Sequence, residues 1–173
     1  MGRNLVLIGY RGAGKSTLAR KLKKILKMPL VSTDEELVSR FGKPIAEWVA
    51  EGGWDEFRRM EMEVVVEAAA PGGRIVDCGG GVVERAENVE CLRRSGVVFY
   101  LCGSSRTLAR RIHPKSGRPS LTGKDPRAEV AEVLARRDPL YRAAAHHVID
   151  VNGGMFFTAA GRIAKIWRRE HGR

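Results

Sequence analysis

The chain has 173 residues with a hydrophobic fraction of 43%, which suits one domain spanning residues 1–173 with a sizeable core. It lacks the roughly 18 consecutive apolar residues of a membrane-spanning helix, and its first apolar run starts at Asn4 without room for a signal peptide, so we expect a cytoplasmic protein with no membrane partner. The formal net charge of +11 permits nucleic-acid binding, but no aromatic-rich platform accompanies it, so we expect no nucleic-acid partner.

Apolar, strand-like runs alternate with helical patterns along the chain, which is typical of a parallel sheet with helices on both faces. Residues 113–126 contain three prolines and two glycines without apolar periodicity, which predicts a mobile excursion. The expected strands cover residues 4–8, 29–32, 74–78, 97–101 and 146–151. The expected helices begin at residue 17 and cover 34–70 (interrupted near 42–44 and 52–53), about 87–95, 105–112 and 127–145, and a last helix follows the final strand.

Residues 9–16 fit the phosphate-binding pattern G-x-x-x-x-G-K-[ST] and lie between an expected strand and an expected helix, as that motif requires. The backbone N–H groups of such a loop and the following helix N-terminus bind phosphate oxygens. We expect Lys15 to reach the outer phosphates and the Ser16 hydroxyl to hold Mg²⁺. The motif therefore predicts binding of a nucleoside triphosphate, and the alternative is a glycine turn with a solvated lysine.

Two further features follow expected strands, at the sheet edge where ligands bind in parallel α/β folds. Asp34 follows the second strand and could accept a hydroxyl proton or orient the acceptor, and the alternative is a helix N-cap. Residues 79–81 are three glycines that would let a ligand approach the backbone, and the alternative is a tight turn.

The sequence also offers arginines suited to anionic ligands. Arg58 and Glu61 are spaced i,i+3 on one helix face, so the carboxylate could fix a guanidinium that receives a substrate carboxylate. The alternative for this couple is a surface ion pair. Arginines that bracket the proline-rich excursion could neutralise charge on a transferred phosphoryl group, or could simply be solvated. They are Arg110, Arg118, Arg136 and Arg137.

With these motifs assembled, the chain resembles shikimate kinase over nearly its whole length. The resemblance rests on the ordered set of residues 9–17, 32–34, 45–47, 57–61, 79–83, 117–121 and 137–141. It implies ATP-dependent phosphorylation of the shikimate 3-hydroxyl, giving shikimate 3-phosphate and ADP in chorismate and aromatic amino-acid biosynthesis. It also implies a three-layer α/β/α P-loop kinase fold, with a five-stranded parallel sheet in the order 2-3-1-4-5. A substrate-binding region at about 33–61 and a mobile lid at about 113–125 belong to the same fold.

The resemblance assigns roles to single residues. By analogy the catalytic residues are Lys15, Asp34 and Arg118. The shikimate-binding residues would be Asp34, Arg58, Gly79, Gly80, Gly81 and Arg137, with Glu61 supporting Arg58. The ATP-binding residues would be Arg11, Gly12, Ala13, Gly14, Lys15, Ser16, Thr17, Arg110 and Arg118, and Ser16 would hold Mg²⁺. The lack of a clear apolar surface stripe leads us to expect a monomer.

One departure from the family pattern concerns the metal. The family usually has Asp-x-Asp after the second strand, whereas this chain has Ser32 at the first position. Asp77, just before the glycines, could supply a substitute carboxylate, and the alternative is a structural role in its strand.

Three other functions stay open at this point. The chain could be a related kinase with another acceptor, or a nucleotide-dependent switch or nucleic-acid-binding protein. Ser32 could also mark an inactive binding module, although the intact Lys15 and Asp34 argue against it.

Overall fold

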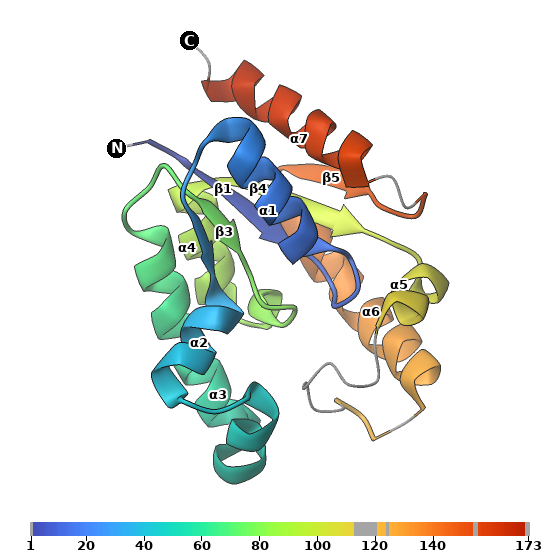
Figure 1. Ribbon diagram of the computed structural model, residues 1–173. Coiled ribbons are helices and arrows are strands. Elements are labelled where there is room, and N and C mark those ends of the chain that lie inside the picture. Colours follow the sequence, from blue (N-terminus) through green and yellow to red (C-terminus); the bar gives the residue numbers. More distant parts are fainter. Residues whose placement is uncertain (1, 113–120, 124, 154–155, 172–173) are drawn as a thin grey trace.

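The computed structural model describes residues 2–112, 121–123, 125–153 and 156–171. Within these residues, five parallel strands form one sheet in the order β2-β3-β1-β4-β5, with helices on both faces (Figure 1). The predicted fold class and strand order are therefore confirmed. The strands are β1 Asn4–Ile8, β2 Leu30–Ser32, β3 Ile75–Asp77, β4 Gly96–Cys102 and β5 His147–Asp150. The helices are α1 Lys15–Leu26, α2 Thr33–Phe41, α3 Ile45–Ala69, α4 Ala86–Ser95, α5 Ser105–Arg111, α6 Pro126–Ala144 and α7 Phe156–His171, and η1 Val82–Glu84 is a short 3₁₀ helix.

The centre of the sheet is the core of the molecule. Leu5, Val6, Leu7 and Ile8 of β1 are fully buried, because β1 has a strand on each side and helices above and below. The buried Asn4 donates from Nδ2 to the carbonyl of Ala69 at 2.7 Å and accepts the N–H of Arg74 at 3.1 Å. These bonds tie the start of the phosphate-loop strand to the end of α3 and the approach to β3.

The two helix breaks that the sequence predicts, near 42–44 and 52–53, take different forms in the structure. Gly42 adopts a left-handed φ of 65° and ends α2, so the break near 42–44 separates two helices. Gly53, with φ 79° and ψ 170°, is non-helical and kinks α3, so the break near 52–53 joins two helical segments within α3. The first turns of α3 consequently project beyond the sheet (Figure 1). They reach the same end of the molecule as the phosphate loop.

The described residues include no helix with both the length and the apolar character needed to cross a membrane.

Candidate active site

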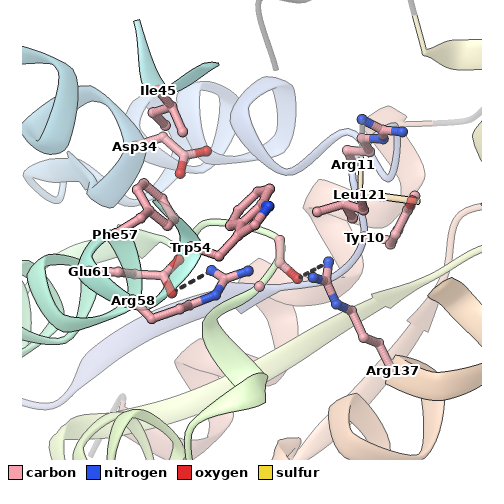
Figure 2. A pocket seen from close by; sticks show the side chains of 12 residues that line it. Tyr10, Arg11, Asp34, Ile45, Trp54, Phe57, Arg58, Glu61, Leu121 and Arg137 are labelled. Atoms are coloured by element: carbon pink, nitrogen blue, oxygen red, sulfur yellow. Dashed lines mark hydrogen bonds and ion pairs between the residues drawn. The ribbon is translucent and has the colours of Figure 1, made fainter. Parts of the chain in front are cut away.

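A pocket lies at the carboxyl end of the strands, and we call it the central pocket (Figure 2). Asp34 enters it from α2, Arg58 from α3 and Arg137 from α6. Gly80 and Gly81 form part of its wall, next to side chains of the phosphate loop and Leu121. It is lined by Tyr10, Arg11, Asp34, Ile45, Trp54, Phe57, Arg58, Glu61, Gly80, Gly81, Leu121 and Arg137.

The phosphate loop requires glycine at specific positions. Gly9, Gly12 and Gly14 have positive φ angles of 146°, 82° and 83°. A Cβ would lie 2.8 Å from the carbonyl oxygen of Leu101 at the first position and 2.7 Å from that of Leu108 at the second. A side chain at either position would therefore strain the backbone and collide with β4 or α5.

Helix α1 starts at Lys15, directly after Gly14, and no side chain caps it. Its first N–H groups point toward the loop, where a phosphate would satisfy them. Lys15 is 7% exposed, and its Nζ donates to the carbonyls of Gly9 at 2.8 Å and Tyr10 at 3.3 Å. The ammonium group is thus held inside the curve of the loop.

Arg11 of the loop pairs with Glu129 of α6. The other oxygen of Glu129, Oε2, accepts the N–H groups of Leu121 at 2.8 Å and Thr122 at 3.1 Å. This carboxylate is buried, and it joins the phosphate loop to the described end of the predicted lid. Nothing in the sequence pattern pointed to Glu129.

Arg58 and Glu61 form the predicted pair, but not at the surface. Nη1 of Arg58 donates to Oε2 of Glu61 at 2.7 Å, and the two side chains are 12% and 1% exposed. The alternative of a surface ion pair is therefore wrong. Burial raises the pKa of Glu61, and the charge and hydrogen bond of Arg58 oppose that rise. The guanidinium also lies over the rings of Trp54 and Phe57, at 5.3 Å from each centroid.

Arg137, like Arg58, is held by several contacts. Its side chain is 4% exposed, and Nε and Nη2 donate to Glu84 at 3.0 and 2.8 Å. Nη1 donates to the carbonyl of Gly80 at 3.4 Å, and the Tyr141 hydroxyl donates to the same carbonyl. Glu84 and Tyr141 are partners that sequence reasoning did not assign. The run at residues 137–141 was the available signal for Tyr141.

Two of the three glycines, Gly79 and Gly81, make room for charged side chains. A Cβ on Gly79 would lie 2.7 Å from Oδ1 of Asp34 and 3.0 Å from Oε1 of Glu61. A Cβ on Gly81 would overlap the guanidinium of Arg58, whereas one on Gly80 meets backbone atoms at an ordinary 3.6 Å or more. The N–H of Gly79 donates to the Thr33 hydroxyl at 2.9 Å, so it is already engaged.

Helix α2 begins with a different cap from the one considered above for Asp34. Its N-cap is Ser32, whose Oγ accepts the N–H of Glu35 at 3.4 Å. The N-cap alternative for Asp34 is therefore wrong, and this side chain faces the central pocket instead (Figure 2). Ser32 is paired with Asp77 in the parallel register of β2 and β3, and Asp77 is 4% exposed.

The remaining predicted residues lie around this pocket or beyond the described chain. Ser16 and Thr17 are exposed in the first turn of α1, and Gly12 and Ala13 belong to the loop. Arg110 is exposed on α5 and does not line the central pocket. Arg118 and most of the predicted lid fall outside the described residues. In the part of the chain that the structure describes, no cluster of three or more His, Cys, Asp or Glu could hold a metal ion.

Comparison with known proteins extends this picture. Residues 11–163 match the family model for shikimate kinase. A shikimate kinase of Oleidesulfovibrio alaskensis is 46% identical over 149 residues, covering 84% of this chain and 87% of the relative. A shikimate kinase 2 of Enterobacter sp. is 41% identical over 155 residues, covering 88% of each. The solved structure of shikimate kinase from Acinetobacter baumannii in complex with shikimate has a TM-score of 0.87 at 32% identity, covering 97% of this chain and 92% of that one. The chain belongs to the shikimate kinase family.

Proposed function

We infer that the chain transfers the γ-phosphoryl group of ATP to the 3-hydroxyl of shikimate, giving shikimate 3-phosphate and ADP. One observation carries this conclusion: a pocket beside a phosphate-binding loop contains the buried guanidinium of Arg137, the partly buried guanidinium of Arg58 and the carboxylate of Asp34. Membership of the family and the likeness to a shikimate complex support the same reaction. The enzyme would act in the formation of chorismate and the aromatic amino acids.

The acceptor would be held by groups matched to its chemistry. Shikimate carries one carboxylate and three hydroxyls on a small ring. Arg58 and Arg137 would receive the carboxylate, because a guanidinium presents a planar fork suited to it. Asp34 would accept a hydrogen bond from the reacting hydroxyl and orient it. The backbone at Gly79, Gly80 and Gly81 would lie against the ring.

ATP would bind across the phosphate loop. The N–H groups of residues 11–17 would surround the phosphates, and Lys15 would exchange its loop carbonyls for the outer phosphates. Mg²⁺ would neutralise charge on the transferred group. The Ser16 hydroxyl fits that ion, because it lies exposed in the first turn after the loop. Arg110 would flank the base, and Arg118 would close over the phosphates from the lid.

Release of ADP from Mg-ATP, with and without shikimate, tests the function, with Arg58→Ala as the comparison. We expect strong stimulation by shikimate in the wild-type enzyme and its loss in the variant, at an unchanged background hydrolysis of ATP. Background hydrolysis that shikimate does not change would reject the acceptor while leaving the nucleotide site in place.

We also propose that the enzyme is a cytoplasmic monomer without a nucleic-acid partner. Cys78, Cys91 and Cys102 are free thiols, which suits a reducing compartment. Light scattering after size exclusion checks the mass, for which 19.1 kDa is expected. A dimer at micromolar concentration would contradict the proposal.

A further inference from the structure

Glu84, the last residue of η1, accepts hydrogen bonds from three arginines. Its Oε2 accepts from Nη2 of Arg58 at 2.7 Å and from Nη2 of Arg137 at 2.8 Å. Its Oε1 accepts from Nε of Arg137 at 3.0 Å and from Nη2 of Arg136 at 2.9 Å. One carboxylate oxygen is therefore shared by the guanidinium groups of Arg58 and Arg137, which both line the central pocket.

Glu84 contacts these two arginines from outside the central pocket. Arg58 and Arg137 line the central pocket and also a second hollow, which we call the rear hollow. Glu84 lines the rear hollow together with Arg136 and Glu87, and it is not part of the central pocket's wall. Its carboxylate thus binds the arginine pair without occupying the space in which an acceptor would sit.

The charges of the site favour an anion at this position. Arg58 and Arg137 are 12% and 4% exposed, so the repulsion between their charges is weakly screened by water. Partial burial would raise the pKa of Glu84, but the hydrogen bond from Arg137 and the charges of the three arginines outweigh it and lower the pKa. Glu84 is therefore ionised near neutral pH and balances the pair.

The backbone that carries this carboxylate is itself held by a hydrogen bond. The N–H of Glu84 donates to the carbonyl of Gly81 at 3.0 Å, within the short helix that follows the three glycines. Glu61 contacts Arg58 from α3, whereas Glu84 joins residues of two separate helices, α3 and α6. Glu84 therefore bridges the two guanidinium groups and links the two helices.

We propose that Glu84 is a positioning residue for acceptor binding: it holds Arg58 and Arg137 at the spacing at which they receive one carboxylate. The inference rests on the proposed function, because it concerns how that acceptor is held. Glu84 does not face the reacting hydroxyl in this arrangement. Its loss should accordingly weaken acceptor binding more than it slows the transfer step.

The test is Glu84→Gln, which keeps the shape of the side chain and removes its charge. We expect the KM for shikimate to rise at least about tenfold, since removing one partner of a partly buried charge pair takes from Arg58 and Arg137 the carboxylate that they share. The kcat and the KM for ATP should stay within about twofold, because uniform loss of binding raises KM alone. Glu87→Gln is the matched control: this exposed residue of the rear hollow has the same charge and should leave the KM for shikimate unchanged.

The methyl ester of shikimate separates positioning from general damage. It keeps the ring and hydroxyls but has no negative charge, so the variant and the wild-type enzyme should bind it about equally. An equal rise of KM for acid and ester, or a fall of KM for shikimate, would overturn the proposal. If Glu84→Gln does not fold, Glu84→Asp keeps the charge on a shorter side chain, and its KM should rise for shikimate and not for the ester. A wild-type enzyme that shikimate fails to stimulate would instead reject the proposed function.

Discussion

The guanidinium of Arg58 lies against the α-carbon of Gly81, at the position that a Cβ would otherwise fill. Gly80, one residue earlier, has ordinary space for a Cβ, whose nearest neighbour would be the backbone nitrogen of Arg11 at 3.6 Å. Neither glycine has a positive φ, so alanine is compatible with the backbone at both positions. The two glycines therefore differ in the side chain that they admit and not in backbone strain.

This difference predicts losses of different size for two neighbouring alanine substitutions. Gly81→Ala should displace Arg58 and lower kcat/KM for shikimate about 10- to 100-fold, because a misplacement of about 1 Å has effects of this size. Gly80→Ala should lower it much less and is the matched control. Steady-state kinetics at saturating ATP measure both. Equal losses in the two variants would mean that the backbone, rather than the position of Arg58, is what the glycines protect.

Lys15 is predicted to stabilise the negative charge of the phosphoryl group during its transfer. Lys15→Met should lower kcat by at least about 100-fold, as the loss of one preorganised charge donor does in other enzymes. Lys23→Met, an exposed change on the same helix, should leave kcat unchanged. The comparison is made at saturating ATP and shikimate, after circular dichroism has shown that both variants fold. Retention of more than a tenth of kcat in Lys15→Met would remove the lysine from the chemical step.

The features that the sequence predicted correctly are those encoded over short distances. The phosphate loop is a contiguous motif, and Arg58 with Glu61 needs one helical turn. The strand order followed from the resemblance and is confirmed. What local patterns could not show is burial, so the Arg58–Glu61 pair could not be distinguished from a surface pair until its exposure was known.

The missed residues contact partners that are distant in sequence. Glu84 meets Arg137 across 53 positions, and Glu129 meets Arg11 across 118. No periodicity or spacing relates such pairs, because the fold alone brings them together. The sequence could not show why positions 79 and 81 need glycine for the same reason, since the side chains that these glycines accommodate come from α2 and α3.

The pairing of Ser32 with Asp77 leads to a prediction about Mg²⁺ binding. Paired residues of neighbouring strands point to the same face of a sheet, so the buried Asp77 carboxylate lies on the same face as the Ser32 hydroxyl. If Asp77 orients water around Mg²⁺, Asp77→Asn should weaken metal binding and Ser32→Asp should strengthen it. Aspartate is also a good N-cap, so the second change preserves α2.

Electron paramagnetic resonance of Mn²⁺ with the enzyme–ADP complex measures this affinity without turnover, and the Mg²⁺ dependence of kcat provides a second readout. Ser32→Ala is the control, since it removes the cap without adding charge. Identical Mn²⁺ titrations for wild type, Asp77→Asn and Ser32→Asp would assign Asp77 a structural role.

The contacts of Glu129 predict that order in the phosphate loop and order in the segment at 121–122 depend on each other. A glutamine in its place cannot accept bonds on both of its terminal atoms, so either Arg11 or the N–H groups of Leu121 and Thr122 lose their buried partner. Such a loss costs about 1–3 kcal/mol. Glu129→Gln should increase hydrogen exchange at residues 121–122 and raise the KM for ATP. Glu132→Gln on the exposed side of α6 should do neither. Unchanged exchange at both amides would show that the link is not needed for order there.

Acid should remove the stabilisation that Glu84 provides. The pKa of Glu84 is lowered in the folded enzyme from an ordinary value of 4.5, so its contribution is fully present above that value. It is lost as the pH falls through the lower, folded pKa. Urea unfolding of wild type and Glu84→Gln between pH 7 and pH 3 should therefore show a gap in unfolding free energy of about 2 kcal/mol at neutral pH. The gap should shrink below about pH 4.5.

Glu61, whose pKa is raised, titrates in both proteins and largely drops out of this difference. A gap that stays constant down to pH 3 would mean that glutamine disturbs packing around the arginines rather than removing a charge. A gap that closes with acid, together with a selective rise of the KM for shikimate at neutral pH, would identify the ionised carboxylate of Glu84 as the group that holds Arg58 and Arg137 in place.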